Sequence, residues 1–422
     1  MGSKSGGSKQ KKKATYVVRP TTAVLTRGYD PKLSVGSARP AVFRSSTYVF
    51  STPEAAERAF DLALGRDVPK EGEEAELIYG RLSHPNAEIL EDQICPLEPL
   101  ARSAACFNTG MAAISTVFFT FCAPKTRFVY TMPLYGGTHL LIHQILLPFG
   151  MEGVPVAAGD TKGLKEAIRK TKDLRLVFIE TPSNPTIRMT DIRAAVEAAK
   201  THKTKPLVAV DNTFLGPAFQ HPLKLGADLS IYSATKYLAG FSDMLGGVVL
   251  GRDRDLMAQL RGARAVFGNI LQPDECWILD TRLPTVILRM NRQSKNAQRI
   301  AEALVDHEKI KKVYYPSLFD DPEQIRIRDS QCDFPGGLIS LDLKGGKKAA
   351  FNFLRRLRLA KNAVSLGGME TLACHPATTT HSEISPEELA QAGVTDGLVR
   401  LSIGLEDWRD LLDDFTSSLD AA

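Results

Sequence analysis

The sequence predicts an α/β protein: a mostly parallel sheet covered by helices on both faces, followed by a smaller α/β domain. Between residues 104 and 250, short apolar runs alternate with amphipathic stretches, as in parallel sheets whose strands are joined by helices. A long helical pattern at 283–304 then leads into two further apolar runs, at 338–343 and 398–403. A chain of 422 residues is long enough for two such domains.

Composition is that of an ordinary globular protein, with 43% hydrophobic and 24% charged residues. Five lysines among the first 13 residues account for the whole formal charge of +5, which argues against a nucleic-acid partner. The amino terminus has no apolar core typical of a secretory signal, and no apolar run is long enough to span a membrane.

The six cysteines are scattered and mostly lie beside apolar residues, so we expect reduced, buried thiols and a cytoplasmic location. Neither the cysteines nor the eight histidines have the spacing of metal ligands, so no metal site is expected.

Four segments are predicted. Residues 1–14 form a disordered basic tail, and residues 15–78 form an irregular arm that contacts a partner subunit. Residues 79–280 form the first α/β domain and residues 281–422 the second. Strands are expected at 104–107, 128–131, 153–156, 176–179, 207–210, 229–232, 247–250, 338–343 and 398–403, with helices at 53–64, 87–97, 162–170, 191–200 and 283–304.

Polar residues follow the expected strands, at the carboxyl ends where parallel sheets bind ligands. After the first strand, Gly110 allows close backbone approach, and the helix opening at Met111 offers N–H groups to a phosphate; a plain turn is the alternative. After the second strand, Tyr135 could lie over a flat ligand or belong to the core.

The loop 180–186 contains two prolines and presents Asn184, which could reach a carboxylate or a hydroxyl or simply stabilise the turn. Asp211 ends a very apolar strand, where a buried carboxylate needs a partner. A protonated pyridine nitrogen would serve, and so would a helix N-terminus or a structural ion pair.

Ser233, Thr235 and Lys236 follow the strand 229–232. Burial favours the neutral amine of a lysine, which can then form a Schiff base with a carbonyl; an ordinary lysine beside two capping hydroxyls is the alternative. Arg400 lies in an apolar strand and calls for a carboxylate, either an internal Glu or the α-carboxylate of an amino acid.

The order of these motifs resembles the family of pyridoxal-phosphate enzymes of cysteine and methionine metabolism. That family includes cystathionine γ-lyase, cystathionine γ-synthase, methionine γ-lyase and the O-acetylhomoserine sulfhydrylases. The resemblance covers residues 45–407 and is carried by YGR at 79–81, TGMAA at 109–113, YGGT at 135–138, ETPSNPT at 180–186, VDNTF at 210–214, SATKY at 233–237, SLGG at 365–368 and RLSIGLED at 400–407.

The resemblance implies that Lys236 holds pyridoxal 5′-phosphate as a Schiff base and shuttles protons, while Tyr135 stacks on the ring and acts as acid or base. The other cofactor-binding residues that it implies are Asp211 at the pyridine nitrogen, Ser233, Thr235, Gly110 and Met111 at the phosphate, Thr213, and Tyr79 and Arg81 reaching the phosphate of the neighbouring subunit. Arg400, Asn184 and Ser365 would hold the substrate α-carboxylate, with Val364 beside the substrate arm.

The fold implied is the aspartate-aminotransferase type (fold type I), with residues 79–280 as the cofactor-binding domain and an active dimer that usually pairs into a tetramer. The chain departs from the family at Ala239 and Phe241, where an Asn and a His are common, and at Gly137, where methionine-specific members carry a Cys. Cystathionine γ-lyases tend to carry a Glu at the position of Val364.

The apolar Val364 favours a small uncharged substrate arm, and hence γ-elimination of methionine, homocysteine or cystathionine to 2-oxobutanoate, ammonia and a thiol. A γ-replacement transferase of the cystathionine γ-synthase or O-acylhomoserine sulfhydrylase type is the alternative. A catalytically silent scaffold protein is a third hypothesis, against which Lys236, Asp211 and Arg400 argue.

Overall fold

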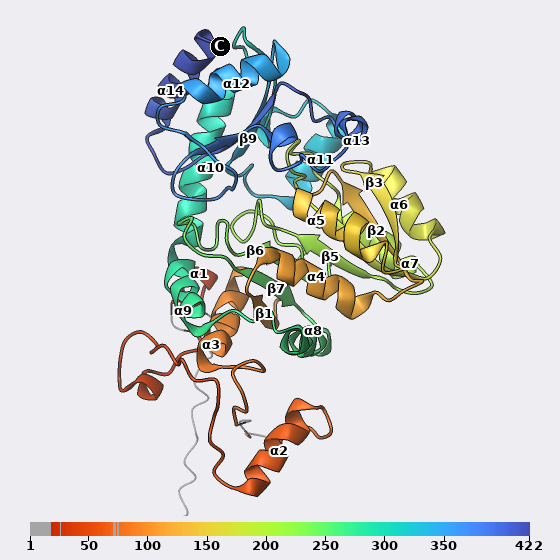
Figure 1. Cartoon of the computed structure of the whole chain (residues 1–422), viewed down its shortest axis with the longest axis vertical. Coiled ribbons are helices and arrows are strands. Elements are labelled where there is room, and N and C mark those ends of the chain that lie inside the picture. Colours follow the sequence, from red (N-terminus) through yellow and green to blue (C-terminus); the bar gives the residue numbers. More distant parts are fainter. Residues whose placement is uncertain (1–17, 26, 71–72, 74–75) are drawn as a thin grey trace, which may run out of the picture.

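The computed structural model describes residues 18–25, 27–70, 73 and 76–422. The basic tail predicted at 1–14 lies outside these residues. Figure 1 shows a central domain with a large sheet, a smaller domain on one side of it, and an amino-terminal arm on the opposite side. The predicted fold class is confirmed, because the chain is α/β with one mostly parallel sheet and a second, smaller sheet.

The large sheet has seven strands in the order β1-β7-β6-β5-β4-β2-β3. The run from β6 to β3 is parallel throughout, and β7 is antiparallel to both of its neighbours. The expected mostly parallel sheet is therefore correct. Its strands are β1 (Ser103–Phe107), β2 (Arg127–Met132), β3 (Glu152–Ala157), β4 (Leu174–Glu180), β5 (Leu207–Asp211), β6 (Leu229–Ser233) and β7 (Gly247–Gly251).

Helices cover both faces of this sheet, because alternate residues of each strand point to opposite sides. In β4, Phe178 packs in the cluster under α4, whereas Val177 and Ile179 pack against α6 and α7. One face carries α4 (Gly110–Phe121), α5 (Gly136–Leu140) and α8 (Arg254–Phe267), and the other carries α3 (Pro85–Ile94), α6 (Thr161–Lys170), α7 (Ile192–Thr201) and α9 (Pro273–Arg282).

The same alternation decides where the strand ends point. Glu180 follows Phe178 by two residues, and Asp211 and Ser233 follow Ala209 and Ile231 by two residues. Phe178, Ala209 and Ile231 all belong to the cluster under α4. The three polar residues therefore point to the α4 side at the carboxyl edge of the sheet.

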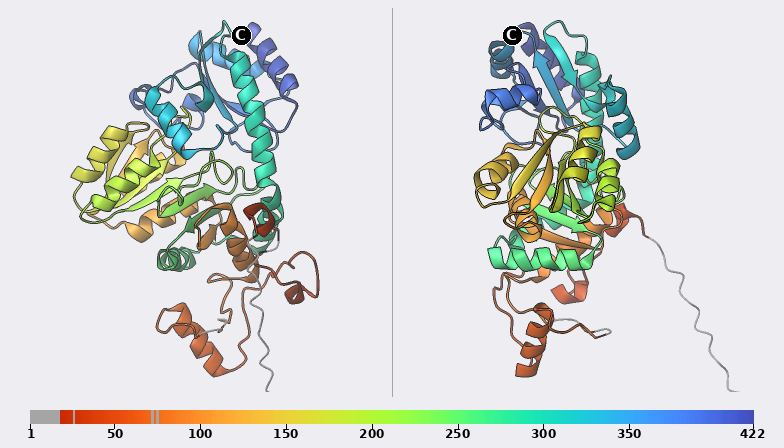
Figure 2. Two further views of the ribbon diagram at one scale, coloured as in Figure 1. Left: turned by 180° about the vertical axis from the view of Figure 1, so that it is seen from behind. Right: turned by 90° about the vertical axis from the view of Figure 1, so that its right-hand side faces the viewer.

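The smaller domain is built on a five-stranded sheet in the order β10-β11-β12-β9-β8, antiparallel except for β10 with β11. The long helix α10 (Val286–Leu304) runs from the central domain along this sheet, as two views show (Figures 1 and 2). The other elements are β8 (Ile310–Tyr314), α11 (Pro322–Gln331), β9 (Leu338–Leu343), α12 (Gly346–Arg356), β10 (Lys361–Asn362), β11 (Leu372–Cys374), α13 (Pro386–Gln391), β12 (Leu398–Ser402) and α14 (Trp408–Asp420).

The amino-terminal arm contains α1 (Pro20–Ala23) and α2 (Pro53–Ala63), and α2 projects away from the rest of the chain (Figures 1 and 2). Between these two helices the arm contacts the body, where Thr47 bridges to Tyr79 and the Phe43 N–H donates to the Asn86 side chain. Large apolar side chains of the arm are exposed, among them Leu33, Val35, Val49, Leu64 and Val68.

Most predicted elements are found within two residues of their expected bounds. The helix expected at 87–97 ends at Ile94 because Pro96 interrupts it, leaving a 3₁₀ turn, Cys95–Leu97. The helix expected from residue 283 begins at Val286, after a similar turn that contains Pro284. Pro155 is accommodated in β3 because β3 is an edge strand.

Five of the six cysteines are buried and all six are free thiols, as the sequence predicts. Among the described residues, none of the helices is long and apolar enough to cross a membrane.

A buried ion pair joins three elements beneath the site. Arg264 of α8 donates to the Glu91 carboxylate of α3 and to the Cys106 carbonyl of β1, 2.8 Å away. Replacing Arg264 with Met should lower the free energy of unfolding by about 3–5 kcal/mol, because Glu91 would remain buried without its cation.

Thermal or denaturant unfolding measures this change. Lys170→Met, which removes a cation from the exposed pair with Glu166, is the matched control and should cost less than about 1 kcal/mol. Equal effects of the two substitutions would contradict the prediction.

Candidate active site

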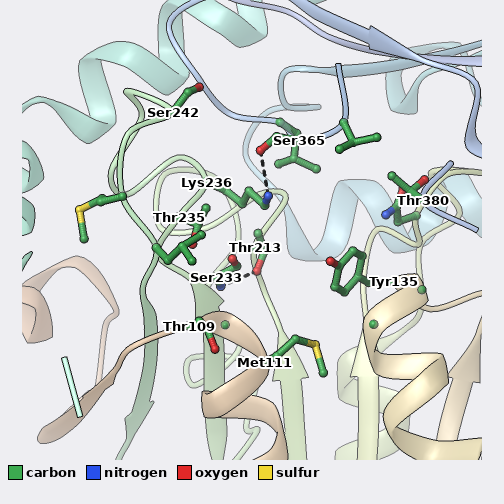
Figure 3. A pocket seen from close by; sticks show the side chains of 18 of the residues that line it. Thr109, Met111, Tyr135, Thr213, Ser233, Thr235, Lys236, Ser242, Ser365 and Thr380 are labelled. Carbon is green, nitrogen blue, oxygen red and sulfur yellow. Dashed lines mark hydrogen bonds between the residues drawn. The ribbon is translucent and has the colours of Figure 1, made fainter. Parts of the chain in front are cut away.

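A cavity of about 1390 Å³ lies at the carboxyl edge of the large sheet and is closed on the other side by the smaller domain. Its walls come from the segments that follow β1, β2, β4, β5 and β6 and from residues 361–366 and Arg400. Figure 3 shows Lys236, Thr213, Ser233 and Tyr135 from the central domain facing Ser365 across this space.

Lys236 supplies a largely buried amine to the cavity. It lies in the turn after β6, and its Nζ donates to Ser365 Oγ, 2.9 Å away (Figure 3). Burial, followed by the positive charge of Arg400, lowers the pKa of Lys236 to about 8. The neutral fraction of this amine near physiological pH is therefore far larger than that of an ordinary lysine, and the neutral form can act as a nucleophile or a proton acceptor.

Asp211 is the buried carboxylate at the end of β5. Its Oδ1 accepts hydrogen bonds from the Thr213 hydroxyl at 2.6 Å and the Thr213 N–H at 3.1 Å. Burial raises the pKa of Asp211. It has no cationic partner among the described residues, so it can receive a cationic group of a ligand. Thr213 Oγ1 in turn accepts the Ser233 N–H at 2.9 Å.

The turn between β1 and α4 packs closely against β6. A Cβ at Gly110 would lie 2.8 Å from the Ser233 hydroxyl, so only glycine permits this approach. Thr109 caps the helix by accepting the Ala112 N–H at 2.9 Å, which leaves the N–H groups that open α4 facing the cavity. This helix start, beside Ser233 and Thr235, has the donors that a phosphate requires.

Arg400 faces these groups from β12 of the smaller domain. Its Nη1 donates to Asn184 Oδ1 and its Nη2 to the Ser365 carbonyl, each 2.9 Å away. Its buried Nε has no hydrogen-bond partner among the described residues. A guanidinium held in this way is oriented to bind a carboxylate. The internal Glu that the sequence left open as its partner is not among these contacts.

Twelve of the fourteen predicted site residues line this one cavity. They are Gly110, Met111, Tyr135, Asn184, Asp211, Thr213, Ser233, Thr235, Lys236, Val364, Ser365 and Arg400. Tyr79 and Arg81 do not line it. The Arg81 guanidinium donates to the Ala265 carbonyl at 2.6 Å and lies 5.7 Å from the Tyr79 ring centroid.

Sequence reasoning missed Glu180, which also lines the cavity. It pairs in register with Asp211 across β4 and β5, and its carboxylate accepts the N–H groups of Tyr135 and Asn184. The available signal was its place directly after an apolar strand, the same position that identified Asp211 in the neighbouring strand.

The two residues that depart from the family pattern behind Lys236 have different surroundings. Ala239 is fully buried in the core, whereas Phe241 is exposed and lies next to Arg282, whose guanidinium is 4.5 Å from the ring centroid. Arg282 also pairs with Asp243, which lines the cavity.

The chain matches a family model and several known proteins over most of its length. The model of the family described as Cys/Met metabolism PLP-dependent enzyme matches residues 21–420. An L-methionine γ-lyase of Pseudomonas deceptionensis is 38% identical over 95% of this chain and 97% of its own length. A cystathionine β-lyase of Bacillus subtilis is 38% identical over 81% of this chain and 85% of its own length.

Solved structures are similar over nearly the whole chain. Cystathionine γ-synthase from Xanthomonas oryzae pv. oryzae, in complex with cystathionine, has a TM-score of 0.87 and 34% identity, covering 96% of this chain and 99% of that one. Cystathionine γ-lyase from Lactobacillus plantarum, complexed with L-serine, has a TM-score of 0.86 and 30% identity, covering 96% and 99%.

The chain belongs to the Cys/Met metabolism family and is a pyridoxal-phosphate-dependent enzyme of sulfur amino acid metabolism with fold type I. The site fits this cofactor on three counts. Asp211 is a buried carboxylate without a cation, Lys236 has a lowered pKa, and Gly110 keeps the helix start clear of a Cβ.

The lowered pKa of Lys236 leads to a prediction for the cofactor-free protein. Because only the neutral amine reacts with an aldehyde, the rate of covalent uptake of pyridoxal phosphate should rise about tenfold per pH unit below pH 8 and then level off. The absorbance of the bound cofactor, followed over time at several pH values, measures this rate.

Arg400→Gln tests whether the charge of Arg400 contributes to the lowered pKa of Lys236. Removing this positive charge should move the midpoint of the profile upward, because the protonated amine is then less repelled. A wild-type midpoint near 10.5, the ordinary value for lysine, would contradict the prediction.

Proposed function

We propose that this member of the family catalyses γ-elimination of a sulfur amino acid, with methionine or homocysteine preferred over cystathionine. A sulfur amino acid and water would yield 2-oxobutanoate, ammonia and a thiol. The observation that carries the proposal is the apolar Val364, which is 56% exposed and lines the cavity next to Ser365 of the carboxylate clamp. The L-methionine γ-lyase that matches 95% of the chain supports it.

Bound pyridoxal phosphate would supply an electron sink for the carbon atoms of the substrate. Lys236 would hold it covalently, with Asp211 at the pyridine nitrogen and Thr213 orienting the Asp211 carboxylate. Ser233, Thr235 and the N–H groups of Gly110 and Met111 would bind its phosphate.

The amine of Lys236 would take the proton from the substrate α-carbon and later move a proton at the β-carbon. Its lowered pKa suits this work, because the neutral form is available near neutral pH. The Ser365 hydroxyl, 2.9 Å from Nζ, would hold the amine on the side of the cavity where Arg400 lies.

Arg400 would bind the substrate α-carboxylate, with Asn184 and the Ser365 backbone fixing its guanidinium. Tyr135 lines the opposite wall, where its ring would lie over the cofactor and its hydroxyl would donate a proton to the departing thiolate. Val364 would contact the sulfur-bearing arm of the substrate, which suits an uncharged group.

A γ-replacement transferase is the second candidate. The similarity to a cystathionine γ-synthase over 96% of the chain favours it, as does a cavity of about 1390 Å³, which has room for a second amino acid. In that reaction a thiol would add to the γ-carbon of an O-acylhomoserine, displacing the acyl group as a carboxylate, and no 2-oxo acid would be released.

The active unit that we propose is a homodimer, with a tetramer of two dimers as the complete assembly. Tyr79 and Arg81 do not line the cavity of their own chain, so they would serve the cavity of a partner. The arm at 15–78 would pack on that partner, which its exposed apolar residues Val49, Leu64 and Val68 support. Residues 79–280 would carry the cofactor, and residues 281–422 would close the substrate side.

The buried free thiols support a reducing compartment, and the cytoplasm is the location that we propose.

A substrate panel tests the reaction itself. Methionine and homocysteine should each yield 2-oxobutanoate, with a higher kcat/KM than cystathionine.

Val364→Glu is the matched variant for this panel. A carboxylate there should lower kcat/KM for methionine about tenfold and raise it for cystathionine, because it can pair with the distal ammonium group. The absence of 2-oxobutanoate with all three substrates, together with thioether formation from an O-acylhomoserine and a thiol, would establish the second candidate instead.

Subunit mixing tests the role of the partner. Lys236→Ala and Arg81→Ala should each be almost inactive as homo-oligomers, because each lacks a group in every site. Mixed oligomers should recover part of the activity, since one site would combine an intact Lys236 with an intact Arg81 from the other chain. The double variant Lys236→Ala/Arg81→Ala mixed with Lys236→Ala should recover no activity, because no chain in that mixture carries Lys236. If the first mixture also recovers no activity, Lys236 and Arg81 serve the site of the same chain.

A further inference from the structure

Glu180 is a fully buried carboxylate at the end of β4 that makes two hydrogen bonds to the backbone. Its Oε2 accepts the N–H of Tyr135 at 2.8 Å, and its Oε1 accepts the N–H of Asn184 at 3.0 Å. The two loops that it holds follow different strands, β2 and β4. One side chain therefore fixes the distance between them.

The Asn184 bond connects Glu180 to the proposed carboxylate clamp. Asn184 Oδ1 accepts from Arg400, and the Asn184 carbonyl lies 3.0 Å from Nε2 of the buried His381. Burial, followed by the charge of Arg400, lowers the pKa of His381 to about 4, so this ring is neutral near physiological pH and can donate only from one nitrogen. Asn184 is thus held on its N–H side by Glu180 and on its carbonyl side by His381.

The hydrogen bond from the Tyr135 N–H connects the Glu180 carboxylate to the cavity wall that carries the Tyr135 ring. The Tyr135 side chain is 42% exposed, so few side-chain contacts hold its ring and the backbone largely sets its position. Directly after it, a Cβ at Gly136 would lie 2.2 Å from the Thr380 carbonyl, which shows how closely the smaller domain approaches this loop. The loop is therefore enclosed between Glu180 and residues of the smaller domain.

Glu180 also faces Asp211, its in-register neighbour on β5. Burial and the charge of Asp211 raise the pKa of Glu180. Such a carboxylate is costly to bury, and its two short bonds to N–H groups offset that cost only while both loops stay in place.

We propose that Glu180 is the positioning residue of this site, which sets the spacing between the Tyr135 wall and the Asn184–Arg400 clamp through two backbone hydrogen bonds. This inference rests on the proposed assignment of Arg400 and Asn184 to the substrate carboxylate. Glu180 itself accepts only from backbone groups and acts through the residues that it holds.

Glu180→Gln in the holoenzyme tests the inference. A glutamine keeps the size of the side chain but offers one acceptor oxygen and one NH₂ group, so one of the two loop N–H groups would face a donor. Glycine is the probe for the clamp, because it carries the α-carboxylate and has no group to eliminate. Its dissociation constant, followed through the absorbance of the bound cofactor, should rise about tenfold on loss of one buried hydrogen bond.

Two further readouts separate positioning from general destabilisation. KM for methionine should rise by a larger factor than kcat falls, because Lys236 and Asp211 remain intact. The circular dichroism of the bound cofactor should also change, since Tyr135 moves relative to the ring.

Asp414→Asn is the matched control, because Asp414 is a buried carboxylate that accepts the N–H groups of Arg358, Leu359 and Ala360, and none of these four residues lines the cavity. It should lower the melting temperature at least as much as Glu180→Gln while leaving the glycine affinity and the dichroism unchanged. Equal shifts in the two variants, or an unchanged glycine affinity in Glu180→Gln, would overturn the inference.

Arg400→Lys distinguishes this inference from the proposed function. If Arg400→Lys weakens glycine binding and Glu180→Gln does not, the clamp assignment holds and the positioning role fails. If Arg400→Lys leaves glycine binding unchanged, the clamp assignment itself fails.

Discussion

The in-register pairing of the parallel strands β4, β5 and β6 is the constraint on which the site depends. It places Glu180 opposite Asp211 and leaves Ser233 one strand further along, all three pointing to the α4 side. A shift of one residue in any of these strands would turn its polar end toward the opposite face. The apolar clusters on the two faces prevent such a shift, because each strand buries alternate residues in a different cluster.

Burial then determines how the charges at this edge behave. Two carboxylates, Asp211 and Glu180, face two cations, Lys236 and Arg400, but the closest bonds of each go to backbone groups, hydroxyls or an amide. None of these four groups forms a short ion pair with another within the described cavity. The groups are therefore held in place and remain available to a ligand, and burial, followed by the proximity of Arg400, keeps Lys236 partly neutral.

Sequence patterns predicted the sheet and most of the site because both follow from local rules. Apolar runs identify strands, and a polar residue directly after such a run lies at the carboxyl edge of the sheet, where Asp211, Ser233 and Lys236 line one cavity. The strands β8, β10 and β11 escaped prediction because they are short or interrupted by lysines, and their pairing comes from the tertiary structure. Glu180 directly follows an apolar run, as Asp211 does, but its partners are backbone groups of the loops after β2 and β4, which no side-chain pattern records.

The two departures behind Lys236 do not contact the groups that we propose to hold the cofactor. Ala239 lies in the core, and Asp211, Ser233 and Thr235 form no hydrogen bond to it or to Phe241. Phe241 instead contacts Arg282, and Arg282 pairs with Asp243 on the cavity wall. Ser242, which lies between Phe241 and Asp243 in the chain, donates a hydrogen bond to Glu370 of the smaller domain. These contacts connect Phe241 to the rim where the two domains meet, and under the proposed function the side chain of the substrate would reach this rim.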